Sequence, residues 1–168
     1  RIPGNHLVPW ANRVNELVER KDFRAIVKNL ATAQAERGHT VLVVSDRVKF
    51  LEELSAEVEN SICITSKTEN QPHLENDIRN GVSKILFGSI GLYKEGISIN
   101  QISSLILATT ISNEPLIVQL VGRIIRKFEG KLRPEVIDIV FDCPTGKKHF
   151  ETRLRAYRSE QYEIKYLN

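Results

Sequence analysis

Short apolar runs alternate with longer amphipathic segments along most of the chain. Five runs are short, rich in β-branched residues and bounded by polar or turn residues, as buried strands are: 41–44, 62–65, 85–87, 105–108 and 136–141. Around them, apolar residues recur at helical spacing over about 11–37, 47–59, 73–80, 114–128 and 147–161. Strands that alternate with helices predict an α/β fold with a mainly parallel sheet and helices on both of its faces.

Cap residues mark the ends of several segments. Asp46 precedes the second helical segment and Asn113 the fourth, and both side chains can accept a hydrogen bond from an N–H in the first turn. Gly38 and Gly130 follow the first and fourth segments, where glycine ends a helix easily. The pattern therefore predicts N-caps at Asp46 and Asn113 and C-caps at Gly38 and Gly130.

The composition is that of one ordinary globular domain. The 168 residues are 41% hydrophobic and 27% charged, which excludes disordered, collagen-like and disulfide-scaffold classes. Cys63 and Cys143 have no CxxC partner and predict buried free thiols in a reducing cytoplasm. The longest uncharged stretch, 97–113, contains Ser, Asn, Gln and Thr, so the chain is not expected to cross a membrane. It begins with Arg1 and lacks methionine, which predicts a piece of a longer protein.

Ligands of a parallel α/β sheet bind where loops leave the carboxyl ends of the strands. The first such loop reads Ser45-Asp46-Arg47 and opens a helix whose N–H groups could bind a phosphate; a capped helix with solvated charges is the alternative. The second contains Ser66 and Lys67 and is by itself an ordinary polar loop.

The third loop is rich in glycine. Dense glycines let the backbone approach a ligand closely, and hydroxyl and lysine side chains beside them suit contact with phosphate or sugar. A flexible surface loop is the alternative. The residues concerned are Gly88, Ser89, Gly91, Lys94, Gly96 and Ser98.

The helical segment 114–128 carries two arginines and an amide on its polar side. At about 100° per residue, Gln119, Arg123 and Arg126 lie opposite a broad apolar face. A solvated polar face is the ordinary explanation. Gly122 argues against it, because a glycine inside a helix costs about 1 kcal/mol relative to alanine and usually has a packing or functional reason. We therefore expect a close approach to this face.

Three segments in this order resemble motifs IV, V and VI of the C-terminal RecA-like domain of superfamily 2 helicases. They are Ser45-Asp46-Arg47, the run GLYKEGISI at 91–99 and the run QLVGRIIR at 119–126, within a resemblance that covers about residues 40–160. The Gln-x-x-Gly-Arg-x-x-Arg element is the most specific. Gly-Ile-Ser, in place of the commoner Gly-hydrophobic-Asp, is similar to the phage UvsW-type branch, and it puts Ser98 where an aspartate often holds the ATP ribose.

The resemblance implies a RecA-like three-layer domain that acts on ATP together with a preceding RecA-like domain of the same chain. That preceding domain would bring the phosphate loop and the acids that bind Mg²⁺. Arg126 would be the arginine finger and Arg123 its phosphate-binding neighbour, since an arginine from across a cleft neutralises charge that develops in phosphoryl transfer. Gln119, Gly96 and Ser98 would contact the nucleotide.

The same resemblance implies a path for one nucleic-acid strand, DNA that is branched or duplex if the UvsW-type likeness holds. Backbone contacts of this kind need hydroxyls, amides and cations rather than base-reading side chains. The expected residues are Ser45, Arg47, Ser66, Lys67, Ser89, Gly91 and Lys94.

The chain lacks the ATP-binding motifs of the preceding domain. Pro144-Thr145-Gly146-Lys147-Lys148 resembles only the tail of a P-loop, because no Ser or Thr follows Lys147, and there is no DExD or DExH box. We take this run as a decoy in which Thr145 helps to start the last helix. This piece alone is therefore expected to bind ATP poorly and to hydrolyse essentially none.

The basic excess lies in the last third of the chain. Residues 119–133 carry five Lys or Arg against one Glu, and the last helical segment adds further cations, including Arg153, that could contact nucleic acid. Tyr157 and Tyr162 could stack on bases, although packing is the more usual role of such aromatics. A nucleic-acid-binding module without motor activity is therefore the alternative function. A free-standing nucleotide-binding or receiver domain fits poorly, because no glycine-rich turn follows the first strand. The first ten residues look like a connector.

Overall fold

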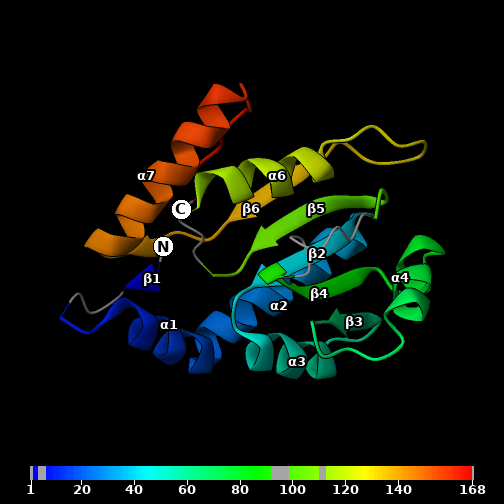
Figure 1. Cartoon of the computed structure of the whole chain (residues 1–168), viewed down its shortest axis with the longest axis horizontal. Coiled ribbons are helices and arrows are strands. Elements are labelled where there is room, and N and C mark those ends of the chain that lie inside the picture. Colours follow the sequence, from blue (N-terminus) through cyan, green and yellow to red (C-terminus); the bar gives the residue numbers. More distant parts are fainter. Residues whose placement is uncertain (1, 4–6, 92–98, 110–112, 168) are drawn as a thin grey trace.

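The protein folds around a five-stranded parallel sheet (Figure 1). The computed structural model describes residues 2–3, 7–91, 99–109 and 113–167. The strand order is β3-β4-β2-β5-β6, and every neighbouring pair is parallel. The strands are β2 (Thr40–Ser45), β3 (Ser61–Ile64), β4 (Ile85–Ser89), β5 (Ile102–Leu107) and β6 (Glu135–Asp138).

Helices cover both faces of this sheet, as the sequence pattern predicted (Figure 1). The three-layer α/β architecture is thereby confirmed. The helices are α1 (Trp10–Glu19), α2 (Lys21–Glu36), α3 (Val48–Glu57), α4 (Gln71–Arg79), α6 (Glu114–Ile124) and α7 (Pro144–Ser159). None of these described helices is long and apolar enough to span a membrane.

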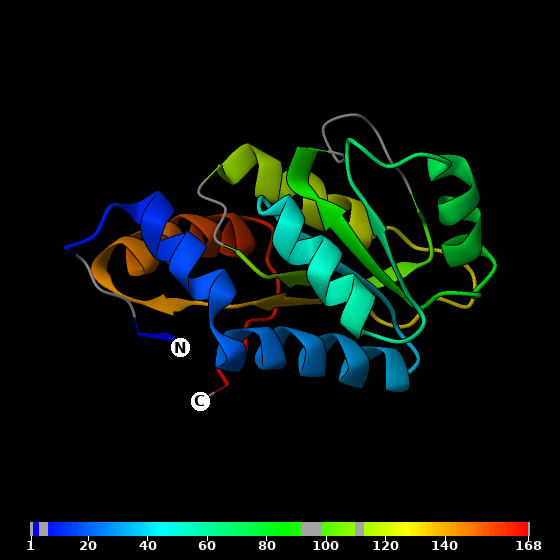
Figure 2. The same cartoon turned by 90° about the horizontal axis from the view of Figure 1, so that it is seen from below.

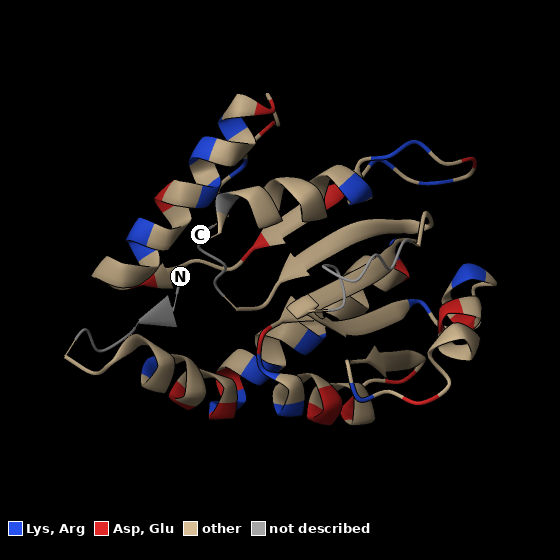
Figure 3. Ribbon diagram, viewed as in Figure 1, with Lys and Arg blue, Asp and Glu red and all other residues tan. Residues whose placement is uncertain are grey.

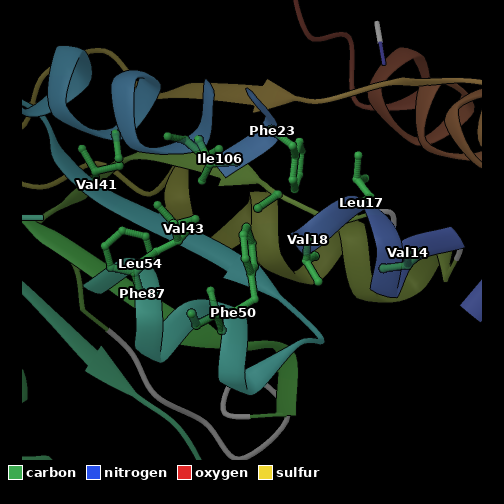
Figure 4. Close-up of a cluster of buried hydrophobic side chains, with 14 of the residues drawn as sticks. Val14, Leu17, Val18, Phe23, Val41, Val43, Phe50, Leu54, Phe87 and Ile106 are labelled. Atoms are coloured by element: carbon green, nitrogen blue, oxygen red, sulfur yellow. The ribbon is translucent and has the colours of Figure 1, made fainter. Parts of the chain in front are cut away.

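Alternating side chains of the central strands point to opposite faces of the sheet and pack into two separate cores. The strands β2, β4 and β5 contain no charged residue, whereas the helices outside them do (Figure 3). Leu42 and Val44 of β2 pack with α4, α6 and α7, while Val41 and Val43 pack with α1, α2 and α3. In the second core the ring of Phe23 stacks on that of Phe50 with 5.7 Å between ring centroids (Figure 4). Burial of this apolar surface holds the three layers together.

The first helical segment is two helices, so the expectation of one helix over 11–37 is wrong. The chain bends at Arg20, which is extended with φ −71° and ψ 127° (Figure 2). The buried positions explain the break. Within α1 they lie at positions i, i+3 and i+4 and within α2 they are three or four residues apart, but Val18 and Phe23, on either side of Arg20, are five apart. The bend lets both helices bury their apolar faces.

The last predicted strand is also two elements rather than one. Residues 135–138 form β6 in the main sheet, whereas β7 (Phe141–Asp142) leaves it and pairs in parallel with β1 (Ile2–Pro3). Trp10 then packs against this second pair, with its ring centroid 5.7 Å from that of Phe141.

Two of the four predicted caps are confirmed. The Asn113 side chain accepts the Leu116 N–H at 3.2 Å, and Gly38 follows α2 with φ +95°. Asp46 caps nothing, because Arg47 occupies the N-cap position of α3 and no side chain caps that helix. Gly130 is not a C-cap either, since α6 ends at Ile124 and not near Phe128.

The P-loop-like run has a structural role at the start of α7. Cys143 is the N-cap, and its sulfur accepts the Gly146 N–H at 3.4 Å. A Cβ at Gly146 would overlap the carbonyl oxygen of Phe141, so glycine is needed for close packing on β7. Thr145, which we expected to start the helix, instead accepts a hydrogen bond from Arg13 at 2.9 Å. Both cysteines are free; Cys143 is buried, and burial raises the pKa of the half-buried Cys63 to about 12.

Candidate functional site

The candidate residues lie at two opposite edges of the sheet. In a parallel β-α-β unit the helix runs back along the strands, so α6 begins near the carboxyl end of β5 and ends near its amino end (Figure 1). The loop that follows α6 supports this placement, because a Cβ on Gly38, just before β2, would lie 3.5 Å from Leu132 Cδ1. We expected all the chemistry at the carboxyl edge; the structure puts Arg123 and Arg126 at the other one. With 11 residues, α6 is about 16 Å long, and its length separates the carboxyl edge from the amino edge.

At the carboxyl edge the structure brings together the ends of β2 and β4. Ser45 and Ser89 are register partners on adjacent strands. Both are buried, so their side chains line the inside of this edge rather than its outer surface. Gly91 is exposed just beyond them, and a Cβ there would meet open space.

Thr109 joins this group, although sequence reasoning missed it. Its hydroxyl lies 3.1 Å from Ser45 Oγ and donates to Asp46 Oδ1 at 3.0 Å. Ser45 Oγ in turn accepts the Arg47 N–H at 3.0 Å. The chain of hydrogen bonds thus ties the end of β2 to Thr109, two residues beyond the end of β5. The sequence could have pointed to Thr109, because it directly follows the predicted strand 105–108, where a loop leaves the carboxyl end of the strand.

Arg47 is held at the start of α3 by its neighbour. Its guanidinium contacts the Asp46 carboxylate at 2.8 Å, and the Arg47 side chain is 27% exposed. Because that carboxylate also accepts from Thr109, the arginine is tied into the hydrogen-bond chain. The Arg47 side chain is therefore partly exposed while its Nη1 is held by Asp46.

Ser66 and Lys67 lie exposed in the turn after β3, at the same edge. The turn is closed by Thr68, whose hydroxyl accepts the Thr65 N–H at 2.7 Å. Both residues are therefore accessible to a large ligand. Lys94, Gly96 and Ser98 lie outside the described residues.

At the amino edge, the end of α6 presents polar side chains on its outer surface. Gln119 is exposed and Arg123 is half-buried one turn further along the helix. Arg126 is exposed but follows the helix end, so it does not share one helical face with the other two as the pattern predicted. A Cβ at Gly122 would meet no atom within 4 Å, so contacts among the described residues do not require this glycine.

The segment after α6 is closed by a lysine that sequence reasoning did not single out. The Lys131 ammonium donates to the carbonyl oxygen of Ile124 and, at 2.9 Å, to that of Arg126. Burial lowers the pKa of Lys131. Cations near a helix C-terminus commonly bind its last carbonyl groups, so a lysine shortly after a predicted helix could have been identified from the sequence.

The last helix is less available to nucleic acid than its charge suggested. Arg153 is fully buried, and its guanidinium binds Asp138 with two contacts of 2.7 Å, so it is a structural residue. Tyr157 is buried as well, donates to Asp138 at 2.9 Å and cannot stack on bases; burial raises the pKa of its hydroxyl. Tyr162 packs against the core beside α6 and α7. Exposed cations remain at Lys147, Lys148, Arg155 and Arg158.

The described part of the chain contains no cluster of three or more His, Cys, Asp or Glu side chains able to hold a metal ion. Both edges instead expose guanidinium and ammonium groups, which are themselves cations. Such groups bind phosphates rather than metals.

Comparison with known proteins gives consistent matches. Residues 21–128 match the model of the helicase conserved C-terminal domain. "Probable helicase D10" of Escherichia phage T5 is 34% identical over 168 residues, which cover 96% of this chain and 37% of that protein. The "ATP-dependent DNA helicase uvsW" of Enterobacteria phage T4 is 25% identical over 99 residues, which cover 59% of this chain and 20% of the relative. The chain therefore spans well under half the length of these relatives.

Solved structures share the fold at lower identity. The crystal structure of T4 UvsW superposes with a TM-score of 0.71 at 16% identity, over 92% of this chain and 36% of that one. The C-terminal domain of the DEAD-box protein Dbp5 gives a TM-score of 0.62 at 17% identity, over 84% of this chain and 80% of that one. These likenesses confirm the RecA-like architecture.

Proposed function

Because the chain belongs to the helicase conserved C-terminal domain family, we propose that it is the second RecA-like domain of an ATP-dependent DNA helicase or translocase. In this proposal ATP binds between this domain and a preceding RecA-like domain of the same protein. The observation that carries it is Arg126, which stands exposed just beyond the end of α6, where a second domain can approach it.

Arg126 is the proposed arginine finger. Its side chain is exposed just beyond the helix end, where a second domain can approach it. A guanidinium that reaches the γ-phosphate neutralises the charge that builds up as the phosphoryl group transfers, and that effect is worth about 10³- to 10⁵-fold in rate in related chemistry. Arg123 would bind the phosphates beside it, and Gln119 would contact the nucleotide or the closing domain. Gly96 and Ser98 stay proposed nucleotide contacts.

Mg²⁺ would enter with the nucleotide and would be held mainly by acidic residues of the preceding domain. It would neutralise phosphate charge during transfer. Of the proposed contact residues at the amino edge, Arg123 and Arg126 are cationic and Gln119 is neutral, so they would complement the phosphates rather than the ion.

The carboxyl edge would bind one DNA strand through its phosphates. Arg47 supplies a guanidinium fixed by Asp46. Ser66 and Lys67 supply exposed polar groups in the turn after β3, which is two strands away from β2 in the sheet. Gly91 and Lys94 would extend the same path. Ser45 and Ser89 would shape this edge from inside, because both are buried.

Because α6 and the sheet join the two edges, closure around ATP at one edge would move the strand-binding loops at the other. Release after hydrolysis would reverse the movement. Repetition of the cycle would translocate the protein along the strand.

The test uses the intact protein and separates the two edges. Arg126→Ala should lower DNA-stimulated ATP turnover by about 10³-fold or more while DNA affinity stays near normal. Arg47→Met should weaken DNA binding and reduce its salt dependence by about one phosphate contact. Lys127→Ala, another exposed cation next to Arg126, is the control and should leave turnover nearly unchanged. Unchanged turnover in Arg126→Ala would remove the finger assignment.

The exposed cations of α7 favour a second candidate, a nucleic-acid-binding module without motor activity. The two candidates differ in the coding sequence upstream of Arg1. A P-loop and an acidic box within about one or two domain lengths favour the motor, and their absence favours the module.

A further inference from the structure

We propose that Lys131 is a positioning residue that sets the place of the Arg126 guanidinium. This inference rests on the proposed role of Arg126. The Lys131 ammonium donates to the carbonyl oxygens of Ile124 and Arg126, which lie on either side of the helix end. It therefore fixes the backbone that carries the Arg126 side chain, while that side chain itself stays exposed.

The helix end needs such a partner. The last regular contact is the Ile125 N–H to the Val121 carbonyl at 3.0 Å, and Ile124 is the final helical residue. The last four carbonyls of a helix have no partner within it. The Lys131 ammonium satisfies the carbonyl of Ile124 and that of Arg126 just beyond the end, so without it this turn would open to solvent and Arg126 would sample more positions.

The lysine reaches back from a loop that is anchored at its base. Gly130 takes φ +75° and lets the chain reverse, and the Lys131 N–H closes the turn on the Phe128 carbonyl at 3.1 Å. At the start of β6, Glu135 accepts two hydrogen bonds of 2.9 Å from Arg37. The Lys131 ammonium is thus held in place by an anchored loop. We call its contacts with the carbonyls of Ile124 and Arg126 the clamp.

The clamp also changes the charge at this edge. A helix C-terminus carries about half a negative charge on its carbonyl groups, which would repel a phosphate that approaches Arg126. An ammonium placed on these carbonyls offsets that repulsion. Figure 3 shows Lys and Arg on both arms of the loop between α6 and β6, with an acidic segment at its far end. Lys131 would therefore reduce the repulsion felt by the charge that develops on the transferring phosphoryl group, without a contact to the nucleotide.

The experiment compares variants of the intact protein. Lys131→Met keeps the length of the side chain but removes the donor, whereas Lys131→Arg can donate to the same carbonyls. Lys127→Met removes an exposed cation from the same loop and is the matched control. We measure kcat and KM for DNA-stimulated ATP hydrolysis, DNA affinity and the thermal midpoint of each variant.

Lys131→Met should lower kcat by about 10- to 100-fold, the cost of misplacing a reacting group by about 1 Å. Its KM for ATP and its DNA affinity should stay within about twofold, since neither depends mainly on the placement of the finger. Lys131→Arg should recover most of the turnover, and Lys127→Met should match the unmodified protein. In the Arg126→Ala background, Lys131→Met should add no further loss, because both changes remove the same contribution.

Each other outcome overturns the inference. Turnover in Lys131→Met equal to that in Lys127→Met refutes the clamp, and so does a loss that adds in full to that of Arg126→Ala. Unchanged turnover in Arg126→Ala is a different failure, because it refutes the finger itself. Should Lys131→Met melt below the assay temperature, all variants are assayed below its thermal midpoint, and turnover equal to that of Lys127→Met again refutes the clamp.

Discussion

Loss of the Arg153 side chain should destabilise the domain strongly, although the residue lies in a helix rich in exposed cations. Its side chain is 1% exposed and that of its partner Asp138 is 11% exposed. The carboxylate accepts two guanidinium contacts of 2.7 Å and the Tyr157 hydroxyl at 2.9 Å. This network fastens α7 to the end of β6.

Arg153→Met would remove the cation and leave the carboxylate buried with the tyrosine hydroxyl. Removal of one partner of a buried ion pair costs about 3–5 kcal/mol, which is a large share of the 5–15 kcal/mol that a domain typically has. For a domain of this size, each kcal/mol lowers the thermal midpoint by about 2–4 °C. We therefore expect a fall of roughly 6–20 °C, measured by circular dichroism or calorimetry together with urea unfolding.

Arg155→Met is the matched control, because Arg155 is exposed on the same helix and donates to the Thr152 hydroxyl at 3.3 Å rather than to a buried carboxylate. It should change the free energy of unfolding by less than about 0.5 kcal/mol. The double variant Arg153→Met with Asp138→Leu should recover part of the loss, since no unpaired charge is then buried. A loss of unfolding free energy below about 1 kcal/mol in Arg153→Met would refute the reasoning, because a buried carboxylate without its cation should destabilise the fold by more than that.

Two further predictions concern α6 and the histidines. Gly122→Ala should stabilise this domain by about 0.5–1 kcal/mol in urea unfolding, because the new Cβ would meet open space. The same change should lower ATP turnover in the intact protein, because a partner is expected to approach this face of α6 closely. Higher or equal turnover would contradict that close approach. Burial lowers the pKa of His39 and of His149, so between these lowered values and about 6.5 the unfolded chain binds more protons than the folded one. Stability should therefore fall as the pH drops below about 6.5, and His39→Asn should flatten the urea midpoint over this range; a midpoint independent of pH from about 7.5 to 5 would contradict this.

Sequence patterns were enough to predict the layers of this fold. The strands β2 to β5 are short apolar runs whose neighbours on both faces must be apolar, and such runs have few alternatives to a covered parallel sheet. The motif-like runs around Arg47 and Arg126 were also visible, because a motif is a spacing along the chain. Asn113 and Gly38 marked helix ends correctly, since each acts on backbone groups a few residues away.

What the sequence could not determine depended on residues far apart along the chain. Asp46 reads as a helix cap, but Thr109, 63 positions later, draws its carboxylate into a different set of hydrogen bonds. Arg153 reads as a surface cation until Asp138 and the packing around it are in place.

By itself, the sequence determined the alternation of strands and helices around the main sheet, because this follows from local periodicity. Its motif-like runs carried the resemblance to the family and the residue types at the candidate site. Only the tertiary structure decided that α6 ends at Ile124, that Lys131 closes that end, and that the arginines stand at the sheet edge opposite Arg47. The physical reason is that helix ends and edges are set by which distant groups satisfy each backbone carbonyl and charge. Those partners become neighbours only when the chain has folded.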